Sequence, residues 1–152
     1  IPKVMTKTKK IVYLPEVYYY YLMRDGSIMH SRNFEKNYED RTWAVDQLLE
    51  YFKRENLIET YRNELEYLVF ENTYFVPSKE IVLNDRKSEY LKKFRDYAYN
   101  KFPQMNKNYY VQQIAGKDKI LLKLLQYRMY GMMVLMSQLR RMKDRLAAVS
   151  RR

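Results

Sequence analysis

Three polar side chains that could bind an anion are gathered in one short turn near the start of the chain. Arg24, Ser27 and His30 lie within seven residues, just past the β-forming run 17–23. The intervening Asp25-Gly26 is a turn sequence, because glycine takes positive φ without steric cost. A guanidinium offers a planar fork of donors, and a serine hydroxyl and turn amides add short-range ones. From residue chemistry alone, the segment is either an anion-binding turn or the solvated end of a surface hairpin.

A short β-hairpin is the element that we expect to position this turn. The β-formers of 11–14 and 17–23 flank Pro15, which ends one strand before the next begins. Tyrosines 18–21 should alternate between the two sides of the second strand, with two rings facing the core and two facing outward. Aromatic faces stack on sugars or nucleobases, although packing between a sheet and helices is the commoner role of such rings.

The run from Lys10 to His30 resembles the closing segment of the catalytic domain of bacterial family 2 (GT-A type) glycosyltransferases. In that family the segment commonly reads as a short strand, a proline, a tyrosine-rich strand and an Arg-x-Gly-Ser-Ile turn, here residues 24–28. The similarity continues through the helical tail at Phe102-Pro103 and Asn108-Tyr109. It covers most of this chain, but only the C-terminal part of such an enzyme.

The resemblance implies an inverting transfer of a sugar from a nucleotide-sugar donor to a polysaccharide or lipid-linked acceptor, in cell-envelope or capsule biosynthesis. It also implies that Arg24 and Ser27 contact the donor diphosphate. His30 equally suits that diphosphate, an acceptor hydroxyl or a structural boundary position.

Family members hold Mg²⁺ or Mn²⁺ through an Asp-x-Asp motif and place the catalytic carboxylate upstream of the tyrosine-rich strand. This chain has no Asp-x-Asp, and its Glu39-Asp40 pair lies downstream, where acidic residues in the first turn of a helix complement the helix dipole. We therefore expect no catalytic residue and no metal ligand in this chain. It should be a piece of a longer polypeptide and inactive alone.

Composition favours a helical chain with a packed core. The 152 residues fit one domain or subdomain, 47% of them are hydrophobic, and only three Gly and four Pro punctuate the sequence. With no Cys and a single His, disulfides, thiolate metal sites and a His-rich zinc site are excluded. The absence of Cys agrees with a cytoplasmic location.

Apolar periodicity predicts a mainly α fold, in which the short N-terminal β-hairpin is followed by a bundle of about four helices. Four stretches have apolar residues at helical spacing: 38–55, 57–72, 85–102 and 117–146. Asn37 is the expected cap of the first helix. The segment 73–83, which contains Pro77, is expected to be a connecting loop, with a helical turn as the alternative. Residues 104–116 should be irregular.

We divide the chain into a hairpin and turn (1–33), a helical domain (34–116) and a basic amphipathic C-terminal helix (117–152). The net charge is +11, and residues 117–152 hold ten Lys and Arg against two Asp. This local excess of positive charge predicts that the region contacts a polyanionic surface or a partner protein. Six cations should contact a membrane or partner: Lys117, Lys119, Lys123, Arg128, Arg140 and Arg141.

Three interpretations of this last helix stay open. In the first, its Met-rich apolar face belongs to the core of the helical bundle. In the second, the helix lies peripherally on the inner face of an anionic membrane. In the third, the helix binds nucleic acid. We do not expect nucleic acid, because no recognition motif accompanies the charge. Self-association is a further alternative. The alternative to a transferase fragment is therefore a non-catalytic basic helical module for oligomerisation or for binding a polyanion, either a membrane surface or nucleic acid. The uncharged stretch 129–138 is too short to span a bilayer, which takes about 18 apolar residues.

Overall fold

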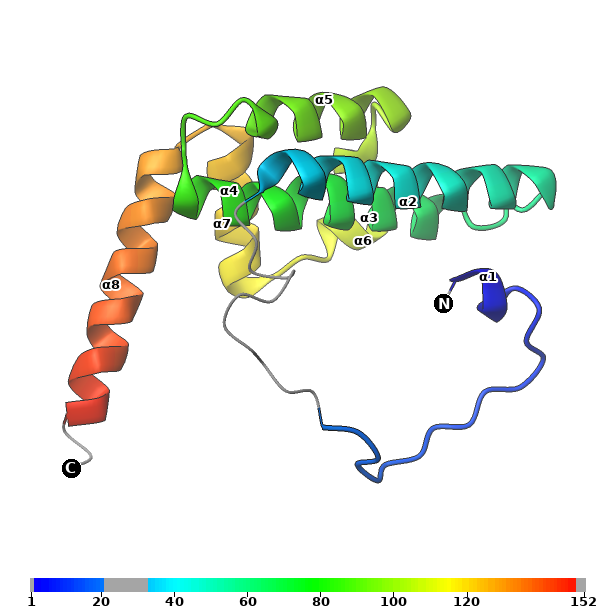
Figure 1. The fold of residues 1–152 in the computed structure, drawn as a ribbon, viewed down its shortest axis with the longest axis horizontal. Helices are drawn as coiled ribbons and strands as arrows, with labels where there is room; N and C mark the ends of the chain where they lie inside the picture. The colour runs from blue at the N-terminus through cyan, green and yellow to red at the C-terminus, as the bar shows by residue number, and fades with distance from the viewer. Residues whose placement is uncertain (1, 21–32, 150–152) are drawn as a thin grey trace.

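The computed structural model describes residues 2–20 and 33–149 (Figure 1). The prediction of an N-terminal β-hairpin is wrong for these residues. Within these ranges no β-strand is present, and the stretches 11–14 and 17–20 are irregular and exposed. The remainder of the second predicted strand lies outside the described residues. An isolated pair of strands is marginal in water, and these β-formers have no third strand or helix packed on them. The mainly helical character of the chain is confirmed.

The longest helix, α2 (Phe34–Arg54), begins four residues before the predicted start. Asn33 rather than Asn37 caps it, because the Asn33 Oδ1 accepts a hydrogen bond from the Lys36 amide at 3.0 Å. The short helix α1 (Pro2–Met5) lies beside the far end of α2, where the hydroxyls of Thr6 and Tyr51 are 2.9 Å apart. The Glu39-Asp40 pair therefore falls beyond the first turn of α2, whose acidic residue is Glu35.

The segment 73–83 is helical, so the predicted connecting loop is wrong. Helix α3 (Arg62–Phe70) runs through a π-helical turn η2 (Glu71–Phe75) directly into α4 (Val76–Asn84), with right-handed helical dihedrals at the junctions. Pro77 stands in the first turn of α4 and has no N–H for the carbonyl four residues earlier, so the chain widens into a π turn just before it. A proline that we interpreted as a break instead marks a local change of helix type.

The core forms where α5 (Tyr90–Lys101) packs across α2 and α4 (Figure 1). The side chains of Phe70 and Phe94 have no exposed surface, and the Phe70 and Phe75 rings stack with centroids 5.6 Å apart. The Tyr97 hydroxyl links α5 to α2 by donating to the Asp46 carboxylate at 2.8 Å. Together with the hydrogen bond, burial raises the pKa of Tyr97 well above its ordinary value. The phenol therefore stays protonated and a donor throughout the physiological range.

The predicted irregular stretch 104–116 contains two short helical pieces. These are the 3₁₀ turn η3 (Met105–Lys107) and helix α6 (Tyr109–Gln112). Asn108 joins them and is 3% exposed: its Oδ1 accepts from the Tyr110 amide at 2.9 Å, and its Nδ2 donates to the Asn63 carbonyl at 2.9 Å. One buried side chain thus caps α6 and ties it to α3.

The predicted single helix 117–146 is broken into α7 (Gly116–Gln126) and α8 (Tyr130–Val149). Arg128 has a φ of 56°, the left-handed region. The Met129 amide donates to the Leu124 carbonyl at 2.8 Å, and the Arg128 amide donates to the Leu125 carbonyl at 3.1 Å. These two bonds form a Schellman motif, which usually carries glycine at its left-handed position. Apolar periodicity continues across the break, so it could not reveal the turn.

Helix α8 touches the bundle along only part of its length. Contacts to α4 and α7 bring Met133 to 2% exposure, and the rest of the helix extends beyond the bundle (Figure 1). None of the described helices is long and apolar enough to cross a membrane.

Candidate functional site

The predicted donor-binding residues Arg24, Ser27 and His30 lie outside the described residues. The segment that leads into them is described as far as Tyr20. There Tyr18, Tyr19 and Tyr20 are 74%, 76% and 87% exposed. The predicted alternation, with two tyrosine rings in the core, is therefore not seen in the described part of this run, because no neighbouring element covers either side of it.

All six predicted contact cations of the C-terminal region are exposed, but they do not form one patch. Lys117 and Lys119 lie in the first turn of α7, Lys123 lies in its last turn, and Arg128 occupies the corner between α7 and α8. Arg140 and Arg141 follow on α8. The structure brings only Lys117 and Arg140 to the same cavity.

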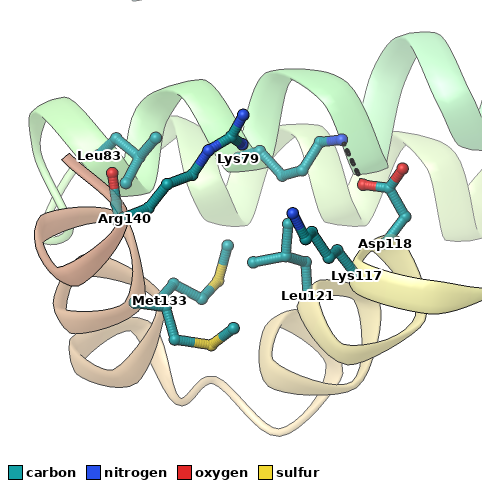
Figure 2. A pocket seen from close by; sticks show the side chains of 9 residues that line it. Lys79, Leu83, Lys117, Asp118, Leu121, Met133 and Arg140 are labelled. Carbon is teal, nitrogen blue, oxygen red and sulfur yellow. Dashed lines mark hydrogen bonds and ion pairs between the residues drawn. The ribbon is translucent and has the colours of Figure 1, made fainter. Parts of the chain in front are cut away.

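This cavity, with a volume of about 310 Å³, lies where α4, α7 and α8 meet (Figure 2). Its walls carry apolar and cationic groups in separate places. Figure 2 shows Met133 and Leu121 pointing toward one another across the cavity, with the Lys117 ammonium and the Arg140 guanidinium nearer to α4. The cavity is lined by Lys79, Leu83, Lys117, Asp118, Leu121, Met133, Met136, Ser137 and Arg140.

Lys79 is the cation of the cavity that sequence analysis missed, because its segment was predicted as a loop. Its ammonium is 3.2 Å from the Asp118 carboxylate and 3.9 Å from the centroid of the Phe75 ring. The ion pair joins α4 to α7, and the cation–π contact fixes the lysine stem against the core. The helical alternative for 73–83 would have placed Lys79 on α4, one turn before Leu83.

Charge at the cavity is positive. Three cations, Lys79, Lys117 and Arg140, face a single carboxylate, Asp118, which Lys79 already neutralises in part. No ion pair of Lys117 is found among the described residues, and Arg140 approaches only the exposed Asp144, at 3.9 Å on its own helix. Exposed pairs of this kind contribute little, so both cations are available to an anion.

Helix α8 carries a second apolar surface, which points away from the bundle. We call it the α8 stripe: Met132, Leu135, Leu139, Met142 and Leu146. These side chains are 47–71% exposed and recur at alternating intervals of three and four residues, which places them on one face of a helix. Met133, one position along from the first of them, is buried on the opposite side.

A second, wider hollow of about 640 Å³ lies beside η3 and the corner between α7 and α8. It includes Tyr74, Arg95, Asp96 and Arg128. Hydrogen bonds from Lys92 and Arg95 hold the pKa of Asp96 below its usual value, so this carboxylate is ionised and already paired. It is a poor general base for that reason.

The described part of the chain offers no group of three or more His, Cys, Asp and Glu side chains that could hold a metal ion. Comparison with family models found no match, and neither the curated proteins nor the solved structures gave a relative of this chain.

Proposed function

We propose that this chain is the C-terminal region of a family 2 inverting glycosyltransferase, acting on a polysaccharide or lipid-linked acceptor of the cell envelope. The observation that supports this proposal is the uncovered β-forming segment 11–20, which is also where the resemblance lies. Large apolar and aromatic side chains along it are 58–87% exposed. Burying such surface is worth roughly 25 cal/mol per Å². In the proposed enzyme, a sheet of the nucleotide-binding half supplies that burial.

In this proposal Arg24 acts on the leaving diphosphate, with Ser27 and His30 as further donors. Breaking the glycosidic bond to the nucleotide leaves negative charge on the diphosphate. A positioned guanidinium stabilises that charge more in the transition state than in the ground state. A divalent ion, Mg²⁺ or Mn²⁺, would neutralise the same diphosphate, and the proposal assigns its ligands to the parent enzyme outside this chain.

The test compares two arginine variants of the full-length enzyme by measuring release of nucleoside diphosphate from a panel of sugar nucleotides. Arg24→Ala should lower kcat/KM by about 2–4 kcal/mol of transition-state stabilisation. Arg54→Ala is the matched control, since Arg54 is an exposed residue of α2 whose contacts, an ion pair with Glu55 and a cation–π contact with the Tyr51 ring, are both on the surface of its own helix and its C-terminal end. Equal activity of both variants would refute the role of Arg24. Turnover by the present chain alone would show that the catalytic parts are misplaced.

A second candidate function, independent of catalysis, is attachment to an anionic membrane surface through the α8 stripe. Its leucines and methionines are exposed beside Arg140, Arg141 and Lys143, an arrangement typical of an interfacial helix. The three–four spacing also matches a coiled-coil seam. A second copy would, however, bring the basic excess of this helix, Arg140, Arg141 and Lys143 against Asp144, close to the same excess on its partner, which favours the anionic surface over self-association.

Co-sedimentation with vesicles tests this attachment. Binding should require anionic lipid, weaken as salt rises, and fall by about tenfold in Leu135→Gln/Leu139→Gln. Trp43→Gln, which alters a more exposed apolar residue on α2, should leave binding unchanged. If vesicles do not bind the chain and the double variant instead abolishes a dimer seen by light scattering, the stripe is a self-association seam.

A further inference from the structure

The cavity between α4, α7 and α8 has the properties of a small-molecule site that neither proposed function uses. Its volume of about 310 Å³ is at the lower end of the range for ligand pockets, which are mostly apolar with a few placed polar groups. Leu83 remains 45% exposed at its edge, although most of the apolar residues around it are covered. The cavity therefore keeps apolar surface in contact with solvent that a ligand could cover.

The positions of the charges limit the class of ligand. Lys117 and Arg140 reach the cavity from different helices, and neither is neutralised by a close carboxylate among the described residues. A purely apolar ligand would leave these two cations unused. A small inorganic anion would leave the apolar part of the cavity, where Leu83 is exposed, in contact with solvent. A molecule that satisfies both regions has one anionic end and one apolar end.

We propose that this cavity binds a single-chain amphiphilic anion, with a carboxylate or monophosphate head between Lys117 and Arg140 and the start of its acyl chain against Leu121, Met133 and Met136. Lys79 supplies a third cation, held in place by Asp118 and the Phe75 ring. Charge-assisted hydrogen bonds to the head give direction, and the methionine side chains adapt to the chain. This proposal does not depend on the transferase activity or on the α8 stripe.

The experiment follows the methionine methyl groups of the whole chain by NMR while decanoate is added below its micelle concentration. Signals of Met133 and Met136 should shift with saturation, whereas that of Met105, which is fully buried elsewhere in the core, should not. Decanol and inorganic phosphate are the matched probes that carry only one end of the proposed ligand. Each should bind at least about tenfold more weakly than decanoate.

Paired charge reversals locate the head group. Lys117→Glu/Arg140→Glu should weaken decanoate binding by about tenfold or more, because both cations of the site are inverted. Lys119→Glu/Arg141→Glu removes the same charge from the same two helices, at positions that do not line the cavity, and should change binding by less than about twofold. All four positions are exposed, so both variants should fold, and circular dichroism checks this.

Three results would overturn the proposal. If decanol binds as tightly as decanoate, the cavity is merely apolar, and if phosphate does so, it is an anion site alone. If the two double variants lose binding equally, the effect is general electrostatics.

A further titration with phosphatidylglycerol vesicles separates two sources of the same head-group chemistry. Met133 shifts with decanoate alone support a free amphiphile, and shifts with vesicles as well support a membrane lipid.

Discussion

Replacing Arg128 by glycine should stabilise the protein, and the sign of this change tests the break between α7 and α8. The φ of 56° at Arg128 lies in the left-handed region, which costs a residue with a Cβ about 1–2 kcal/mol. Glycine removes that cost but loses about 0.5–1 kcal/mol through its freer unfolded chain. The expected net effect is a gain of about 0.5–1 kcal/mol in the free energy of unfolding, measured by urea denaturation at an unchanged slope.

Lys119→Gly is the matched control for this measurement. Lys119 is exposed in α7 and has helical geometry, so glycine there should lower the free energy of unfolding by about 1 kcal/mol. If residues 117–146 instead formed one continuous helix, Arg128→Gly would destabilise the protein by a similar amount. A loss at both positions would therefore refute the Schellman motif at Arg128 and restore the single helix that apolar periodicity predicts.

Three further predictions follow from named contacts. Asn108→Ala should lower the free energy of unfolding by about 2–3 kcal/mol, because it removes the cap of α6 and the hydrogen bond that ties α6 to the Asn63 carbonyl of α3; a thermal shift near zero would contradict this. Tyr97→Phe should cost about 1 kcal/mol in urea denaturation, through loss of the hydrogen bond to Asp46, and no loss would mean that water replaces it. The hydrogen bond from Lys7 lowers the pKa of Glu55 in the folded protein. The stability that this ion pair contributes is therefore present above about pH 4.5, the ordinary pKa of the carboxyl, and is lost as the pH falls through the lowered pKa of the folded state. Acid should therefore release α1 from α2, as followed by NMR of Thr6, and the same transition in Glu55→Gln would exclude this pair as the cause.

Helix positions were predictable where one face of a segment is buried. The stripes that include Val45 and Phe52 in α2 and Phe94 and Ala98 in α5 are core residues in the structure. Helix ends were less predictable, because the sequence offers two asparagines near the start of α2 and only the fold decides which of them caps it. The cavity residues Lys117 and Arg140 were also chosen from the sequence, but as members of a general basic surface.

The sequence by itself determined the helical class, the apolar faces and the concentration of charge near the C-terminus. These properties follow from composition and periodicity, which are local. Tertiary structure decided that Pro77 continues a helix through a π turn, that Arg128 takes left-handed geometry, and that Lys79 meets Asp118 from another helix. The pair of Lys79 and Asp118 depends on contact between segments distant in the chain, and at Arg128 the packing of α8 against α4 and α7 outweighs the preference of the residue against left-handed geometry. The cavity exists for the same reason, since no single segment contains both its cations and its apolar walls.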